Sequence, residues 1–378
     1  MKKISAFFIA VSLLFAAGCD VKKEAEQTPQ DCKIALAIKR DTTETIRNLI
    51  DRFTEENSGI SVKIMELSDE SVENHRVLGS VLAGNEVTVD VMMVEDIWMK
   101  EFVSVGYLRP IDAGIGFNRE EYPRKISDIM YTDGEMYGIP LMLDAGIMLY
   151  RNDLTDGKLD YTELLRANSP EYSIQGVDKE EMICVVQECI RLAGGAEEGI
   201  ELYKSLVEKS KYASDDYLSD FKSGKTAYAR SWTSNYTQLQ RSFTNIQGKV
   251  GTSLLSRGDN QYSTARAYFV SVNDASDKSK AEEIKTLLRF LLREDIQLEI
   301  AKGTGTLPLK YRYYSSPVVC DYNEYNERFA KCLDKLNYRA SEERYTFLSE
   351  KAQSAVSRYI SGETDVSEAA EAVKKTME

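Results

Sequence analysis

The chain has 378 residues, of which 43% are hydrophobic and 29% charged, a composition typical of a globular protein with room for two domains. Its 48 basic residues face 61 acidic ones, which gives a formal net charge of −13. This negative net charge argues against nucleic acid as a partner and against electrostatic binding to anionic lipid. It is compatible with a neutral ligand.

The N-terminal segment has the layout of an export signal. Two lysines precede a short apolar stretch, and small residues lead to Cys19, which predicts a signal peptide over residues 1–18. The sequence Ala-Gly-Cys resembles a bacterial lipobox, although Ala16 stands where leucine is usual. The resemblance implies that Cys19 is acylated and anchors the protein to the outer face of the cytoplasmic membrane or in the periplasm. Residues 19–32 are then the lipidated cysteine and a flexible tether.

Five more cysteines follow Cys19, and an odd number cannot all pair within the chain. For an exported protein, we expect a disulfide between Cys320 and Cys332. Cys184 lies in a helical apolar pattern, so we expect a packed thiol there.

Strand and helix patterns alternate through the first third of the chain. Buried strands are expected at 33–39, 60–66 and 88–94, and each is followed by an amphipathic helix. Thr42 or Thr43 is expected to cap the first of these helices. This alternation predicts βαβ units and a parallel sheet.

Asp144 is a lone carboxylate in the apolar run GIPLMLDAGIMLYRN. Two strands, 134–140 and 145–151, are expected to join around it. Burying an unpaired carboxylate costs several kcal/mol, so either a basic partner such as Arg151 or Arg339 meets Asp144, or the run opens onto a polar cavity.

The remainder of the chain is mostly helical, with isolated strands. Strands are expected at 226–232 and 266–272, and helices at 179–193, 197–209, 214–223, 234–243, 278–302, 322–335, 343–361 and 365–376.

Catalytic motifs are missing from the sequence. His75 is the only histidine, so neither a histidine-based triad nor a multi-histidine metal site can form. No phosphate-binding glycine motif is present. The segment GTGTLP at 303–308 contains two glycines but is predicted to be a loop. We therefore expect no cofactor, no metal and no enzymatic activity, and the chemistry that remains is recognition.

Several segments resemble the extracellular solute-binding proteins of carbohydrate ABC transporters, in particular the trehalose- and maltose-binding branch. The most specific match is GEMYGIPLMLDAGIMLYRNDL, and further matches are VTVDVMMVEDIWMKEFVSVGYLRPID, IQGVDKEEMICVVQECIRLAGG, FKSGKTAYARSW and NYRASEERY. The resemblance runs over nearly the whole mature chain.

This resemblance implies an α/β periplasmic-binding-protein fold of type II, with two lobes joined by three crossings and each lobe a sheet flanked by helices. The first lobe would be 33–143 with 265–336, and the second 146–262 with 340–378. It also implies a sugar ligand held between lobes that close by a hinge motion. The expected partners are a membrane permease and its ATPase, and the protein itself is expected to be a monomer.

Transferred position by position, the resemblance implies a set of ligand-binding residues. Each has a plainer structural interpretation as well: an ion pair for the charged residues, a strand end or helix cap for the acids, and core packing for the aromatic residues. The implied residues are Asp144, Glu95 and Glu44 as acids, Trp232 and Tyr268 as aromatic stacking residues, and Arg339 at the third crossing.

The chain also departs from the family pattern. Arg266-Ala267-Tyr268 replaces a usual Gly-Gly-Trp, and Lys179 stands where an aromatic residue is common. Fewer aromatic residues and an extra cation would change which ligand fits. A receptor for another solute, such as a polyol, glycerol phosphate or peptide, therefore remains an alternative. Two further alternatives are an extracellular glycan-degrading enzyme and a surface lipoprotein used for adhesion.

Overall fold

The computed structural model describes most of the chain after the N-terminal segment. The signal peptide, Cys19 and all of the expected tether except Cys32 lie outside the described residues. Those residues are 32–84, 88–167, 172–174, 179–210, 217–240, 244–320, 325–339 and 342–377.

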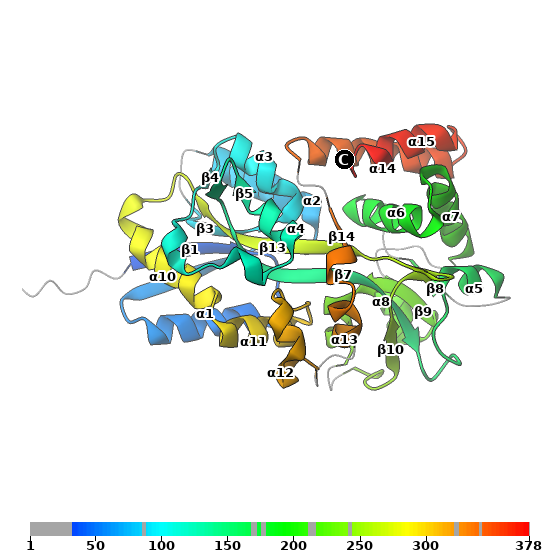
Figure 1. Cartoon of the computed structure of the whole chain (residues 1–378), viewed down its shortest axis with the longest axis horizontal. Helices are drawn as coiled ribbons and strands as arrows, with labels where there is room; N and C mark the ends of the chain where they lie inside the picture. Colours follow the sequence, from blue (N-terminus) through cyan, green and yellow to red (C-terminus); the bar gives the residue numbers. More distant parts are fainter. Residues whose placement is uncertain are drawn as a thin grey trace, which may run out of the picture.

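Ten strands of the described chain form one continuous sheet, which runs through both lobes of an α/β fold (Figure 1). The main path is β2-β1-β3-β13-β7-β9-β8, while β10 pairs with β7, and β4 and β14 pair with β13. The strands of this sheet are β1 (Cys32–Ile38), β2 (Ile60–Glu66), β3 (Val91–Glu95), β4 (Leu108–Arg109), β7 (Ile139–Arg151), β8 (Tyr172–Ser173), β9 (Tyr228–Trp232), β10 (Val250–Ser253), β13 (Thr264–Asn273) and β14 (Asn337–Tyr338).

The predicted parallel arrangement of the first three strands is confirmed, because β1 pairs in parallel with both β2 and β3. Two small hairpins lie apart from the main sheet. They are β5 (Tyr131–Thr132) with β6 (Glu135–Met136), and β11 (Ser256–Arg257) with β12 (Asn260–Gln261).

Strand β7 connects the two lobes. Its first part, through Ala145, pairs antiparallel with β13, whereas its second part, from Gly146, pairs antiparallel with β9. Asp144 therefore lies where β7 changes its neighbour. The expected break between two strands is wrong: β7 is a single strand of 13 residues, and the carboxylate marks a change of pairing partner.

Helices cover the sheet in both lobes (Figure 1). The first lobe carries α1 (Thr45–Glu56), α2 (Ser71–Ala83), α3 (Met99–Ser104), α4 (Arg124–Ile129), α10 (Ala281–Leu291) and α11 (Glu294–Thr304). The second carries α5 (Tyr161–Arg166), α6 (Lys179–Ala193), α7 (Ala196–Lys209), α8 (Tyr217–Ser223), α9 (Thr233–Leu239), α14 (Tyr345–Ile360) and α15 (Val366–Lys374). The short helices α12 (Pro317–Cys320) and α13 (Tyr325–Ala330) lie near the junction of the lobes.

Short 3-10 turns complete the described elements. They are η1 (Asp96–Trp98), η2 (Ala113–Ile115), η3 (Arg119–Glu121), η4 (Lys278–Lys280), η5 (Tyr311–Ser315) and η6 (Leu333–Lys335).

Two hydrophobic clusters stabilise the molecule. The larger fills the first lobe and continues across the junction to Phe221 and Val250. The smaller lies in the second lobe, where α6 and α7 pack with α14 and α15. Trp98 belongs to the first cluster and stacks near Phe102, so it is a core residue.

Several local predictions differ from the structure. The expected helix over 278–302 is two helices that break at Leu292 and Arg293. At the start of α1 the N-cap position is Glu44, so neither Thr42 nor Thr43 occupies it. The Asp41 carboxylate accepts the Ile46 backbone N–H at 2.8 Å, and the Thr43 hydroxyl accepts that of Thr45 at 3.3 Å.

The cysteines give one correction and one confirmation. Cys332 is a free thiol, so the expected disulfide with Cys320 is not formed. The side chain of Cys320 lies outside the described residues. Cys184 is a buried free thiol, as predicted. Within the described ranges, we find no helix whose length and apolar character would let it span a bilayer.

Candidate functional site

A cavity of about 350 Å³ lies between the two lobes. Small-molecule sites span roughly 300–1,000 Å³, so this cavity has the size of a site for a small guest. The first lobe contributes the loop after β1, the start of α1, the loop after β2, the middle of β3, and the end of α11 with the turn after it. The second contributes the starts of α6, α8 and α9 and the end of β9. Among the lining residues are Lys39, Arg40, Asp41, Thr42, Thr43, Met142, Asp144, Glu181, Tyr217, Trp232, Ser234, Asn235, Arg266, Tyr268, Thr304 and Thr306.

Asp144 lies on the cavity wall with its side chain 4% exposed. Its carboxylate accepts hydrogen bonds from the Thr233 hydroxyl at 2.6 Å and the Ser234 hydroxyl at 2.7 Å. The backbone N–H of Ser234, in the first turn of α9, donates a further bond at 3.1 Å. A helix N-terminus presents free N–H groups to anions, which explains how an apolar strand accommodates this carboxylate.

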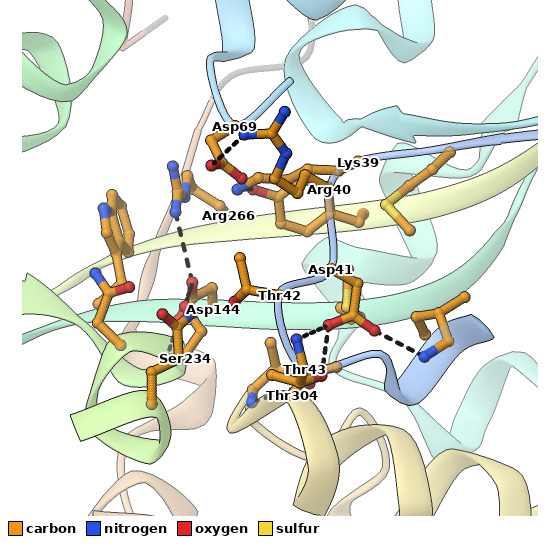
Figure 2. A pocket seen from close by; sticks show the side chains of 18 of the residues that line it. Lys39, Arg40, Asp41, Thr42, Thr43, Asp69, Asp144, Ser234, Arg266 and Thr304 are labelled. Atoms are coloured by element: carbon orange, nitrogen blue, oxygen red, sulfur yellow. Dashed lines mark hydrogen bonds and ion pairs between the residues drawn. The ribbon is translucent and has the colours of Figure 1, made fainter. Parts of the chain in front are cut away.

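The basic partner of Asp144 is Arg266. These two residues stand opposite each other in the β7–β13 register, and the distance from Arg266 Nη2 to Asp144 Oδ2 is 3.5 Å (Figure 2). Neither partner expected from the sequence has this role: Arg151 pairs with Asp153 and Arg339 lies in a separate cluster. The carboxylate thus has a guanidinium partner and also lines a polar cavity.

Trp232 lies on the same wall, and its ring lies between two guanidinium groups. The Cζ atoms of Arg266 and Arg230 are 3.7 and 4.1 Å from the centroid of the ring. Two guanidinium groups this close to the ring centroid would clash if they lay on the same face of the indole. Arg266 and Arg230 therefore cover opposite faces of the ring. Trp232 is buried, and its Nε1 has no hydrogen-bond partner among the described residues.

Tyr268 faces the cavity two residues after Arg266 on β13. Lys39 Nζ lies 5.3 Å from the centroid of its ring and donates a hydrogen bond to its hydroxyl at 3.2 Å. Burial raises the pKa of Tyr268, although the neighbouring cations Arg266 and Lys39 oppose that rise. The hydroxyl is therefore protonated at neutral pH and can serve as a donor as well as an acceptor.

Glu95 and Arg339 do not line this cavity. They meet each other in a buried cluster beside it, at 2.9 Å between Arg339 Nη2 and Glu95 Oε2. Arg339 also contacts Asp96 and, at 3.4 Å, Glu180 at the start of α6. The cluster therefore joins the residue that follows β14 to the end of β3 and the start of α6.

The carboxylates of this cluster differ in their pKa values. Burial raises the pKa of Asp96 to about 6, even though Arg339 opposes the rise. Burial also raises the pKa of Glu180. For Glu95, burial acts in the same direction, but Arg339, Arg266 and Lys39 outweigh it and its pKa is lowered.

Glu44 also lies away from the cavity. It is exposed and precedes α1 with a positive φ of 58°. The residues nearest to it that line the cavity are Asp41, Thr42 and Thr43. Of the six ligand-binding residues implied by the sequence, the structure places Asp144, Trp232 and Tyr268 on one cavity and the other three elsewhere.

The sequence interpretation missed Lys39, Ser234 and the threonines of the cavity. One signal could have found Lys39, because it follows a parallel strand and ligands of open α/β sheets bind beyond the carboxyl ends of such strands. Ser234 carries no comparable signal, because its role depends on where α9 begins relative to β7.

The fold and this cavity define a class: a two-lobed periplasmic-binding-protein-like protein with a polar site between its lobes. The chain belongs to the bacterial extracellular solute-binding protein family, whose model matches residues 48–327.

Solved structures of the same architecture are similar to this chain over most of its length. Maltose-bound MalE3 of T. maritima is 21% identical, with a TM-score of 0.82 over 92% of this chain and 99% of that one. The GacH receptor of Streptomyces glaucescens, solved unliganded and with acarbose, is 18% identical, with a TM-score of 0.78 over 91% and 97%. A ribitol complex of an ABC transporter solute-binding protein from Agrobacterium radiobacter K84 is 16% identical, with a TM-score of 0.77 over 92% and 99%.

Proposed function

We propose that this protein is the substrate-binding component of an ABC importer for a small, uncharged, polyhydroxylated solute, a sugar or a polyol. The observation that carries the proposal is the Asp144 carboxylate on the wall of a cavity between the two lobes. Carboxylates accept hydrogen bonds from hydroxyl groups, and threonine, serine and tyrosine hydroxyls are also part of the lining. The bound sugars and the ribitol of the three similar proteins support this class of ligand.

The lobe boundaries predicted from the sequence remain part of this proposal. The change of pairing partner at Asp144 and Ala145 supports a first crossing there, and the packing of α14 and α15 on α6 and α7 supports a C-terminal segment in the second lobe. Closure of the two lobes around the guest would present one conformation to a membrane permease driven by an ATPase.

We also propose that the chain catalyses no reaction. His75, the only histidine, is not among the residues that line the cavity. Incubation of a glycan panel with the protein should therefore release no reducing ends.

Acylation of Cys19 is a further proposal, supported by the order of residues 1–19. When the protein is expressed with residues 1–19, it should be found in the membrane fraction of the cells and should enter the detergent phase on detergent extraction. A Cys19→Ser variant should lose that partition if lipid carries the anchor.

The experiment that tests the binding proposal is a thermal-shift panel. A ligand that binds only the folded state raises Tm by mass action, and a concentration of 100 times Kd adds about 2.7 kcal/mol. We expect at least one monosaccharide or polyol to raise Tm. A response confined to glycerol phosphate or to short peptides would contradict the proposed ligand class.

A further inference from the structure

Both aromatic rings that line the cavity and were expected to stack on a sugar already carry a basic side chain. Arg266 lies over Trp232 with 3.7 Å between Cζ and the ring centroid. Lys39 Nζ lies 5.3 Å from the centroid of the Tyr268 ring and 3.2 Å from its hydroxyl oxygen, so it holds the hydroxyl end of that ring. A sugar ring that stacks on an aromatic residue needs an open face, so the guanidinium over Trp232 bears directly on what the cavity can hold.

The two guanidinium groups on Trp232 have different surroundings. Arg230 is fully buried in the second lobe, where Glu188 pairs with it at 2.6 Å. It does not line the cavity, whereas Arg266 does. Arg230 therefore covers the inner face of the indole, and Arg266 covers the face that a guest in the cavity would meet.

Arg266 is held in place from several sides. Asp144 lies 3.5 Å from Nη2 and Glu181 lies 3.4 Å from Nη1. The indole adds a cation–π contact, which is stronger where the cation is desolvated. A guest that stacks on Trp232 would have to displace Arg266 from both carboxylates and from the ring.

We propose that Arg266 determines specificity by covering the stacking face of Trp232, so that the cavity takes a guest no larger than one sugar ring or an open-chain polyol of that size. This inference rests on the proposed function and narrows its ligand class. Recognition then comes from hydrogen bonds, which the Asp144 carboxylate accepts and which the hydroxyl groups of the lining accept and donate.

The cover itself can be tested without any ligand. The chain has two tryptophans, so a Trp98→Phe background leaves Trp232 as the only indole. Acrylamide should quench this indole weakly with Arg266 present and several-fold more strongly in Arg266→Ala. Arg266→Met is the control, because it removes the same charge but keeps an unbranched apolar chain that replaces the arginine chain as far as Nε. Equal quenching in Arg266 and Arg266→Ala proteins would overturn the inference.

The consequence for specificity is tested by titration calorimetry with glucose, ribitol, maltose and trehalose. The wild type should favour the single-ring or open-chain probes over both disaccharides. Arg266→Ala should raise disaccharide affinity relative to glucose by about tenfold, which corresponds to about 1.4 kcal/mol, whereas Arg266→Met should not. A wild type that binds maltose or trehalose as tightly as the smaller probes would overturn the inference.

The two proposals fail in different ways. If no carbohydrate or polyol binds the wild type, the proposed function fails, while the quenching result still decides whether Arg266 covers Trp232. If sugars bind but the preference for small guests is absent or does not depend on Arg266, the proposed function stands and this inference fails.

Discussion

Asp144 is accommodated in an apolar strand because hydroxyl, backbone N–H and guanidinium donors surround its carboxylate. The sequence marked this residue, since a lone acid in an apolar run requires partners. It did not identify Arg266, because that pairing depends on the register of two strands 122 residues apart. Trp232 shows the same limit: its place on the cavity was predictable, but the guanidinium groups on its two faces were not.

Glu188 is the residue whose loss should destabilise the second lobe most clearly. Its carboxylate accepts bonds from Arg230 at 2.6 and 3.1 Å and from the Thr264 N–H at 3.0 Å, and both side chains of the ion pair are fully buried. Glu188→Ala would leave a buried guanidinium without its partner carboxylate, so we expect a loss of about 3–5 kcal/mol in the free energy of unfolding. Urea denaturation followed by circular dichroism measures it.

Glu181→Ala is the matched control for Glu188→Ala. Glu181 lies on the same helix, is 20% exposed and pairs with Arg266 at 3.4 Å. Its removal should cost less than that of Glu188, because Arg266 keeps a second carboxylate partner, Asp144, at 3.5 Å. Similar losses in the two variants would contradict the role assigned to the buried pair.

At the scale of elements, β7 explains why the sequence placed two strands where the structure has one. Asp144 interrupts the apolar pattern, and this interruption predicted the end of one strand and the start of another. In the structure the strand continues, and only its pairing partner changes from β13 to β9. Gly146 makes this passage feasible, because a Cβ atom there would lie 2.4 Å from a Glu188 carboxylate oxygen. The strongly periodic helices α1 and α7 were predictable, since each buries one face of its own sequence, whereas α6 is buried on nearly all sides.

The buried cluster of Arg339 with Glu95, Asp96 and Glu180 should make the stability of the protein depend on pH. The pKa of Asp96 rises from an ordinary 3.8 to about 6 in the folded protein. Between these values the folded state keeps a proton that the unfolded state has lost, so the free energy of unfolding falls as pH rises. The contribution of Asp96 is about 3 kcal/mol, at 1.36 kcal/mol for each unit of pKa shift.

Asp96→Asn removes this titration, so Tm of the variant should fall less than that of the wild type between pH 4 and pH 6. Scanning calorimetry at several pH values measures the difference. Asp51→Asn, a change on the exposed side of α1, serves as the control and should leave the profile of the wild type unchanged. The groups that face Asp96 in the cluster, Arg339 and Glu95, are retained in both variants. Identical profiles for Asp96→Asn and the wild type would contradict the raised pKa.

At the scale of the whole molecule, the two lobes are joined by strands that run through both, and the cavity lies where these strands pass from one lobe to the other. The resemblance predicted this architecture correctly. Composition and periodicity alone gave only alternating strands and helices in the first lobe and a helical second lobe. The order of strands in the sheet depends on contacts between distant segments, such as β3 with β13, which no local pattern encodes.

The central claim is that a small polyhydroxylated guest binds between the lobes and is held by Asp144. The most direct test is titration calorimetry of the wild type and Asp144→Asn with the sugar or polyol that gives the largest thermal shift. We predict saturable binding of one guest per chain by the wild type and a loss of at least about a hundredfold in affinity in a folded Asp144→Asn protein, which corresponds to about 2.7 kcal/mol. Unchanged affinity in the variant would contradict the claim.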